Sequence, residues 1–343
     1  MIGEGGNQYL SVHDVHGAGV GDVEPGLLGS LQWGREQTEV SRCEWRVSTA
    51  NNPLVEKLRP WLHWVTVWED GKSLWTGPIQ RVHISRSGGT SVSCRDTSTF
   101  MWRTRIPLTK QWVGNDPTVI ANELWVPMLQ LHQVKVTPVV LESVGQQFSY
   151  SATADSKRLF QAMDDLVKIG LEWTVVKGTP VLGVQPDGQV GDTLQEDDFL
   201  EELDRIRDGT DTFNDVKLQG QNYQSTQVAE LAGLRLQTVV SLDDVFGVSN
   251  IQNAARQYAQ STARIRDTLD VPPLASLSPR CGLSLDDLVP GAHFGVSAQG
   301  IENMMVLKSM QVTTTPGKYD VQVTLETVKE TVELTEKVTG GAL

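Results

Sequence analysis

Two histidines flank an aspartate near the amino terminus, in the segment His13-Asp14-Val15-His16. Imidazole nitrogens and carboxylate oxygens bind zinc, so His13, Asp14 and His16 could begin a metal site and serve a metal-dependent hydrolase. The flanking residues are rich in glycine, however, and no second group of ligands accompanies them. The pattern favours polar histidines in a loop, and we predict no metal ion and no cofactor.

A run of acidic residues extends from Glu196 to Asp204. It could supply paired carboxylates or calcium ligands, but it lacks the alternating aspartates and central glycine of a calcium loop. Phe199, Leu200 and Leu203 instead indicate an amphipathic turn with a solvated acidic face. The sequence also lacks a glycine-rich phosphate loop, a Gly-x-Ser-x-Gly elbow and a His-Glu-x-x-His motif. We therefore predict no catalytic residue and no enzymatic activity.

Three cysteines, Cys43, Cys94 and Cys281, are odd in number and far apart in the sequence. This spacing indicates neither a disulfide framework nor a metal site, so we expect buried, reduced thiols. Cys281 has no histidine beside it that would activate it as a nucleophile.

Tryptophan is abundant, with ten in the chain, and four of them lie close together. Such residues stack on sugars when they are exposed, or fill a core or a subunit interface when they are covered. Both faces of the predicted hairpin that holds them are bulky, which favours core and interface. Carbohydrate or receptor binding through exposed tryptophans remains the alternative. The four residues are Trp61, Trp64, Trp68 and Trp75.

The length of 343 residues predicts two or three domains. A net charge of −13 argues against duplex nucleic acid as a specific ligand, because phosphates require clustered lysine and arginine. The first residues lack the basic start and apolar centre of a signal peptide, and no apolar run is long enough to span a bilayer. We expect a protein made in the cytoplasm with no membrane span.

The first part of the chain, residues 1–106, reads as mostly strand. Asp70-Gly71 between alternating segments is a strong hairpin signal, because glycine tolerates positive φ. Gly77-Pro78 interrupts the second strand, where we expect a bulge or a corner. A small antiparallel sheet that bends at a glycine suggests a closed barrel.

A different pattern occupies residues 107–206. Asp116 and Pro117 cap a short helix over 118–125, which we expect Pro127 to end. A strand is expected over 134–140. A helix over 155–169 ends at Gly170 and leads into a hairpin, so this segment forms a small α/β module.

The last part, residues 207–330, again reads as strands. They are expected near 216–220 and 234–240, with one helix over 250–266 between them and the closing strands. Leu288-Val-Pro-Gly291 turns the chain into those strands, which run to Val328. Residues 331–343 read as a C-terminal tail.

Four segments occur in the order Val67–Ile79, Arg103–Ala121, the helix-hairpin unit leading to Phe213–Gly220, and Leu288–Val328. In this order they resemble the baseplate hub or tail-associated (minor tail) proteins of long-tailed phages that infect actinobacteria. The resemblance implies a β-rich α+β fold with two tail-tube-like antiparallel β-barrel domains flanking the smaller α/β module. Some members carry a lytic C-terminal extension, which we do not expect in a chain that ends at Leu343.

The resemblance also implies a function in the virion. A homotrimer with two barrels in each chain would present six similar modules, and so adapt a six-fold tail tube to a three-fold tail tip. The implied partners are the distal tail ring protein, the C-terminus of the tape-measure protein and other tail-tip proteins. DNA would pass during ejection without specific binding, which agrees with the acidic composition.

Overall fold

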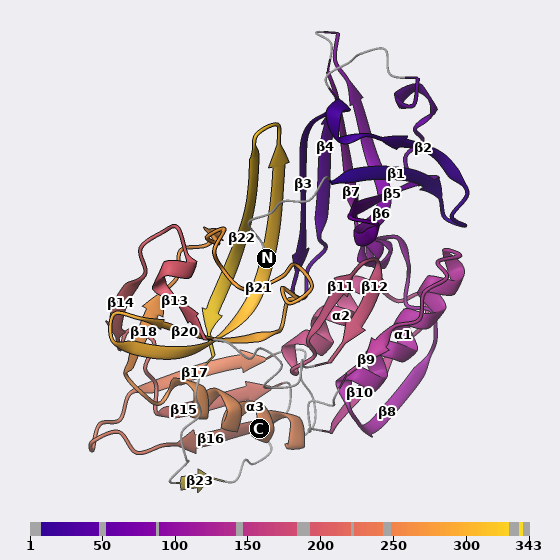
Figure 1. Ribbon diagram of the computed structural model, residues 1–343. Helices are drawn as coiled ribbons and strands as arrows, with labels where there is room; N and C mark the ends of the chain where they lie inside the picture. Colours follow the sequence, from indigo (N-terminus) through magenta and orange to yellow (C-terminus); the bar gives the residue numbers. More distant parts are fainter. Residues whose placement is uncertain are drawn as a thin grey trace.

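The computed structural model describes residues 8–47, 53–86, 89–141, 147–183, 193–220, 223–242, 248–328 and 336–338. Its largest element is a sheet of twelve strands, to which both ends of the chain contribute. The strand order is β13-β20-β21-β3-β4-β7-β6-β5-β1-β2, with β22 beside β21 and β19 beside β22. In Figure 1 the yellow β21 and β22 stand next to the indigo β3 and β4. The predicted β-rich α+β character is confirmed.

The strands of this main sheet come from two distant parts of the sequence. The amino-terminal strands are β1 (Tyr9–Asp14), β2 (Gly19–Val23), β3 (Leu28–Glu36), β4 (Arg42–Val47), β5 (His63–Glu69), β6 (Lys72–Ile84) and β7 (Thr90–Arg95). The others are β13 (Leu194–Gln195), β19 (Ala275–Ser276), β20 (His293–Ala298), β21 (Ile301–Thr315) and β22 (Lys318–Thr327). Short 3₁₀ helices lie at Pro25–Leu27, Val55–Lys57, Thr97–Arg103 (η3) and Glu196–Asp198 (η4).

The expected closure of each end into its own barrel is wrong. Within the described residues the hydrogen-bonded path runs from β13 to β2 and does not return on itself. The reason is that β3 and β21 pair with each other. The backbone N–H and C=O groups of an edge strand need hydrogen-bond partners, and here β3 and β21 provide them for each other.

The hairpin about Asp70-Gly71 is confirmed, with φ of 49° and 76° at the two turn residues. The strand was expected to be interrupted at Gly77-Pro78, but β6 continues through both residues. At this point β6 changes partner, pairing with β5 up to Pro78 and with β7 from Ile79 onward. A Cβ on Gly77 would lie 2.0 Å from the carbonyl oxygen of Arg95, so the crossing needs glycine.

The middle of the chain forms an α/β unit, to the right in Figure 1. Its helices α1 and α2 pack over a core that includes Trp112, Trp125 and Trp173. The elements are β8 (Lys110–Asn115), α1 (Pro117–Leu131), β9 (Val139–Val140), β10 (Phe148–Ala152), α2 (Leu159–Lys168), β11 (Trp173–Val176) and β12 (Thr179–Leu182).

Two details of this unit differ from the prediction. Helix α1 continues past Pro127, because Leu124, Met128 and Leu129 are all buried on its inner side and that burial outweighs the lost hydrogen bond. The strand expected over 134–140 is reduced to β9. The caps are confirmed: Asp116 accepts a hydrogen bond from the Thr118 N–H at 2.8 Å, and Gly170 has φ of 103°.

A smaller sheet with one helix lies at the bottom of Figure 1. Its order is β17-β15-β16-β23, and α3 packs on it. The elements are β15 (Asp215–Gly220), β16 (Gln224–Val228), β17 (Gln237–Leu242), α3 (Val248–Thr262) and β23 (Glu336–Val338), and the separate ribbon β14 (Asp204–Asp208) pairs with β18 (Arg266–Asp270). The strands expected at 216–220 and 234–240 and the helix expected over 250–266 correspond to β15, β17 and α3. No described helix is long and apolar enough to cross a membrane.

Candidate functional site

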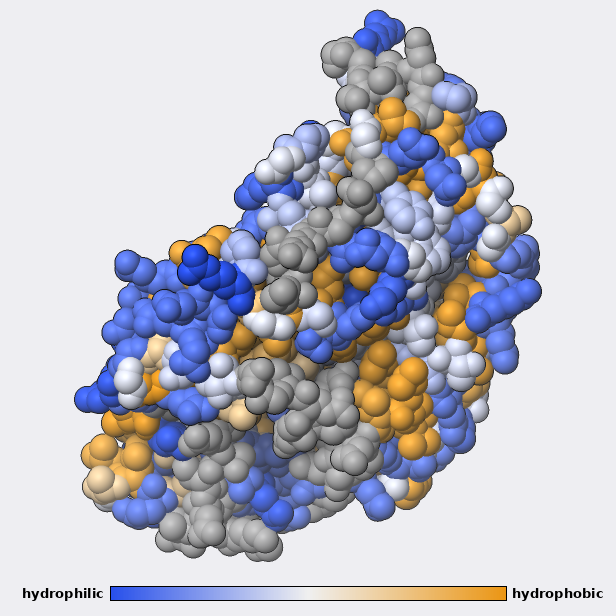
Figure 2. Space-filling view, in the orientation of Figure 1, coloured by the Kyte–Doolittle hydropathy of each residue, from blue (hydrophilic) through white to orange (hydrophobic). Residues whose placement is uncertain are grey.

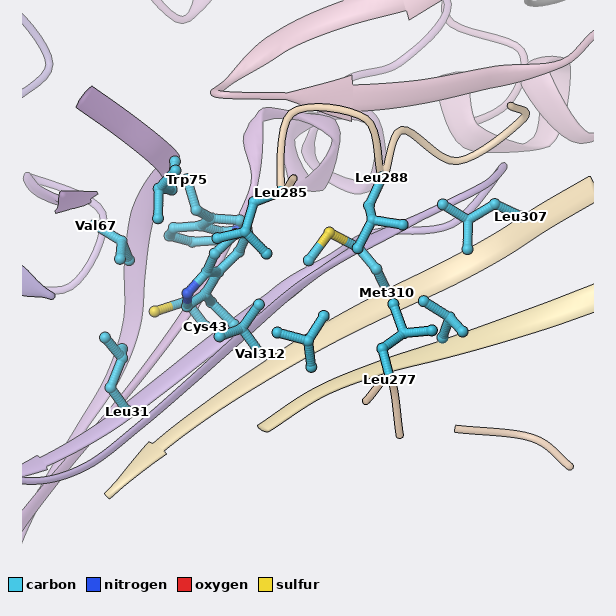
Figure 3. Packing of buried hydrophobic residues seen from close by; sticks show 14 of the residues in the cluster. Leu31, Cys43, Val67, Trp75, Leu277, Leu285, Leu288, Leu307, Met310 and Val312 are labelled. Atoms are coloured by element: carbon cyan, nitrogen blue, oxygen red, sulfur yellow. The ribbon is translucent and has the colours of Figure 1, made fainter. Parts of the chain in front are cut away.

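The pairing of β3 with β21 joins the two ends of the chain, and we call it the seam. It runs in antiparallel register from Glu36 opposite Ser309 to Leu31 opposite Thr314. On one face Leu31 and Trp33 from β3 meet Met310 and Val312 from β21, and all four are buried. Figure 3 shows Leu31, Cys43 and Trp75 in the same apolar cluster as Leu277, Leu307 and Met310. The two ends therefore share one core.

The backbones approach each other closely along the seam at Gly34. A Cβ built on this residue would lie 2.5 Å from the carbonyl oxygen of Met310. Real Cβ atoms do not approach backbone oxygens to that distance, so any side chain would push β21 away. Glycine at this position sets the spacing of the two strands.

Arg35 is a fully buried cation that ties three segments together. Its guanidinium donates to the carbonyl oxygens of Leu285 and Leu288 at 2.8 and 3.0 Å, and to that of Leu74 at 3.3 Å. Burial lowers the pKa of Arg35 to about 10, which leaves it charged at neutral pH. Because β3, β6 and the loop after β19 all contribute to this contact, Arg35 links the amino-terminal strands to the carboxy-terminal part.

The middle unit joins the main sheet where β3 ends. The N–H groups of Gln37 and Thr38 donate to the carbonyl oxygens of Lys308 and Trp173, at 2.8 and 2.7 Å. The Thr174 hydroxyl donates to the Glu36 carbonyl at 2.8 Å. Residues 36–38 are thus one place where all three parts of the chain meet.

Two carboxylates at this meeting point are poorly solvated. Burial raises the pKa of Glu36 to about 7, and repulsion from the nearby Glu39 contributes to this rise to a smaller extent. Burial also raises the pKa of Glu172, which lies in the same contact beside Gln37. The three-part contact is therefore sensitive to pH near neutrality.

The structure gives His13, Asp14 and His16 local structural contacts. The two ring nitrogens of His13 lie 2.7 Å from the Asp14 carbonyl oxygen and 2.8 Å from the Thr66 hydroxyl. The Asp14 carboxylate accepts from the N–H groups of His16 and Ala18, and the Ala18 contact lowers the pKa of Asp14. Within the described ranges no three histidine, cysteine or acidic side chains are grouped to hold a metal ion.

Two of the four clustered tryptophans are buried, and the other two are half-buried. Trp64 and Trp75 are only 5% and 2% exposed. Trp68 stacks on Tyr9 with ring centroids 6.3 Å apart, and Trp61 packs against Phe100. Trp64 and Trp75 therefore belong to the core, whereas Trp61 and Trp68 are half-buried at its border.

The remaining candidates also have structural surroundings. In the acidic run Phe199 and Leu203 are buried, whereas Leu200, predicted to pack with them, is 63% exposed because the segment forms the single turn η4 and no longer helix. Cys43, Cys94 and Cys281 are free and buried, as predicted. Burial raises the pKa of all three thiols.

Arg35 was not predicted to have a role, although the alternation of residues in its strand indicates that its side chain is buried. Leu31, Trp33 and Arg35 alternate in Leu28–Glu36, so they share one face of a strand. A charged residue in phase with two core residues must find hydrogen-bond acceptors inside the protein. The identity of those acceptors depends on tertiary contacts that the sequence does not reveal.

No protein-family model matches the chain, and no curated protein sequence matches it. Solved structures do. The chain has the fold of prophage tail proteins. It superimposes on the 43 kDa tail protein of prophage MuSo2 from Shewanella oneidensis with a TM-score of 0.64 and 12% identity, over 93% of this chain and 98% of that one.

Two further structures give the same result. The tail protein from Neisseria meningitidis MC58 has a TM-score of 0.63 and 16% identity, over 93% of this chain and 96% of the other. The prophage tail protein gp18 from Listeria monocytogenes has a TM-score of 0.60 and 11% identity, over 94% and 95%. Because nearly the whole of each chain is covered, the shared feature is the arrangement of all three parts. The expectation of an actinobacterial host stays a prediction.

Proposed function

We propose that this protein is a non-enzymatic structural hub of a phage tail tip. The observation that carries the proposal is the seam, where one chain supplies two adjacent groups of strands from its two ends. The backbone pairing of β3 with β21 sets their register, Gly34 permits their close approach, and Arg35 links the two ends. The likeness in fold to three tail proteins over nearly their full lengths supports the same role.

The seam suggests how the hub would assemble. Three chains in a closed ring would present six groups of strands, matching a six-fold tail tube above to a three-fold tip below. The distal tail ring protein, the C-terminal end of the tape-measure protein and further tip proteins are the proposed neighbours. The ring would form part of the ejection channel, and the net charge of −13 would let DNA pass without binding.

The first experiment measures the mass of the purified full chain by light scattering after size-exclusion chromatography. A trimer has three times 37.7 kDa, or about 113 kDa. If the chain remains monomeric alone, it should form the trimer when mixed with the distal tail ring protein. A stable dimer or tetramer under both conditions would overturn the three-fold model.

A second experiment locates the protein in the virion. Antibodies against the full chain, detected by electron microscopy of intact particles, should label the end of the tail distal to the capsid. Labelling along the tail shaft or on the capsid would contradict the proposed hub.

A further inference from the structure

A cleft of about 610 Å³ lies between the main sheet and the middle unit, and four arginines line it. Two come from neighbouring strands, Arg42 on β4 and Arg95 at the end of β7; Arg103 ends η3, and Arg158 precedes α2. Only two carboxylates, Glu39 and Asp164, face the same space. We call it the arginine cleft. It is locally basic in a chain whose net charge is −13.

The placement of Arg42 and Arg95 is costly for the isolated protein. They are directly opposite each other in the antiparallel pairing of β4 with β7. Like charges at facing positions of a sheet repel and reduce stability. Within the described residues none of the four arginines forms a close ion pair. Glu36 attracts Arg42 only at longer range, so the repulsion is not neutralised by a direct carboxylate contact.

Gln80, which also lines the cleft, lacks a hydrogen-bond partner for its side-chain nitrogen in the part of the chain that the structure describes. Gln80 lies at the irregularity where the register of β6 against β7 shifts between Ile79 and Arg81. Such bulges turn a side chain out of its usual direction, and this one lines the cleft. Its side-chain nitrogen is buried without a hydrogen-bond partner among the described residues. A buried unpaired donor is unfavourable, and an acceptor in the cleft would remove the penalty.

The walls of the cleft indicate what kind of acceptor fits. Guanidinium groups bind carboxylates and phosphates through paired hydrogen bonds. Glu39 and Asp164 repel any anion beside them, but they can accept hydrogen bonds from the N–H groups of a peptide backbone, which inorganic phosphate lacks. Val40 and Trp102, the latter stacked on Phe160 at 5.1 Å, add apolar surface. A polypeptide combines carboxylates, carbonyl oxygens, N–H donors and aliphatic carbon, whereas inorganic phosphate offers only anionic oxygens.

We propose that the arginine cleft binds an acidic polypeptide segment of a partner protein. Arg42, Arg95 and Arg158 contact its carboxylates, and Gln80 donates to one of its oxygens. This site goes beyond the proposed hub function and does not require a trimer, so either proposal can fail while the other stands.

The test uses the full chain and a rhodamine-labelled hexaglutamate peptide, with binding followed by fluorescence anisotropy at low salt. Wild-type protein should bind saturably, and the double variant Arg42→Ala/Arg95→Ala should bind at least tenfold more weakly. The matched control is Arg46→Ala/Arg81→Ala. It removes two exposed arginines that do not line the cleft, Arg46 on β4 and Arg81 on β6. It should change the affinity less than twofold.

The double variant also reports on its own folding. Because it removes a repulsive facing pair, its thermal unfolding temperature should equal or exceed that of the wild type. Loss of binding with an unchanged unfolding temperature supports the site. Equal losses in the double variant and its control would show general electrostatic attraction and overturn the proposal. Displacement of the peptide by pyrophosphate or a short oligonucleotide at lower concentrations than unlabelled hexaglutamate would overturn it in favour of a phosphate ligand.

Discussion

Two buried polar residues, Arg35 in the seam and Asn214 just before β15 of the small sheet, each hydrogen-bond to several backbone groups. They differ in how far apart in the sequence those groups lie. Arg35 donates to three carbonyl oxygens that belong to two distant parts of the chain. The Asn214 side chain donates to Ala229 and Leu234 and accepts from the Leu236 N–H, all within one local segment.

The packing around the two residues differs as well. The apolar cluster at the seam extends through both ends of the chain, as the residues labelled in Figure 3 illustrate. The buried cluster of the small sheet consists of Leu218, Ile251 and Ala255. On the face of the molecule drawn in Figure 2, the exposed hydrophobic residues form separate patches among hydrophilic ones. The seam therefore has the larger buried core, and we expect the small sheet to be a local unit whose opening costs less free energy.

The largest effect is expected for Arg35→Ala. The substitution leaves three buried carbonyl oxygens without their donor and opens a cavity, so the free energy of unfolding should fall by about 4 kcal/mol. Chemical denaturation followed by tryptophan fluorescence measures it. Arg35→Lys, which keeps the charge but not the planar fork, should lose less. A loss below about 1 kcal/mol for Arg35→Ala would show that the residue does not hold the two ends together.

Gly34→Ala should lower the free energy of unfolding by about 3 kcal/mol, because the new Cβ would collide with the Met310 backbone. The control is Gly29→Ala on the same strand, where the nearest atom to the new Cβ is 3.6 Å away. That variant should be nearly neutral. If both substitutions have the same effect, the close approach at the seam is not what restricts position 34.

Asn214→Ala should have a smaller and local effect, about 2 kcal/mol, since three hydrogen bonds are lost within one segment. Hydrogen exchange detected by mass spectrometry should show faster exchange in peptides covering 215–242, with unchanged protection in β3 and β21. Asp211→Ala, an exposed neighbour, is the control. Equal loss of protection at the seam would mean that the small sheet and the seam unfold as one unit.

Features that depend on neighbouring residues could be predicted from the sequence, whereas features that depend on tertiary contacts could not. The Asp70-Gly71 turn, the Asp116 cap and the Gly170 helix end depend on neighbouring residues, and all three were predicted correctly. The seam was missed because β3 and β21 lie at opposite ends of the chain. Helix α1 was predicted too short because the burial that carries it past Pro127 comes from tertiary packing.

The arginine cleft could not be predicted for the same reason. Arg42, Arg95 and Arg158 belong to three separate segments, and each resembles an ordinary surface arginine in the sequence. Only the register of β4 with β7 places the first two opposite each other. The seam and the cleft are both products of strand pairing, which depends on long-range contacts.

The smallest effect concerns the pH dependence of the seam, through Glu36. Its pKa is about 7 in the folded protein against 4.5 for the free side chain. Between these values the folded protein binds more protons than the unfolded chain, so stability is fully present below pH 4.5 and falls as the pH rises through 7. Because the side chain is partly exposed, we expect about 1 kcal/mol for this loss.

Glu36→Gln should remove that part of the slope: it should match the wild type near pH 4.5 and exceed its free energy of unfolding by about 1 kcal/mol at pH 8. Denaturation curves at intervals from pH 4.5 to 8 measure the difference, and Glu44→Gln, exposed on β4, controls for the loss of one charge. Burial shifts Glu172 in the same direction, so a slope of the same sign should remain and shrink in the double variant Glu36→Gln/Glu172→Gln. A wild-type slope that Glu36→Gln leaves unchanged would place the titrating group elsewhere, and the meeting point of the three parts would not be the pH-sensitive contact.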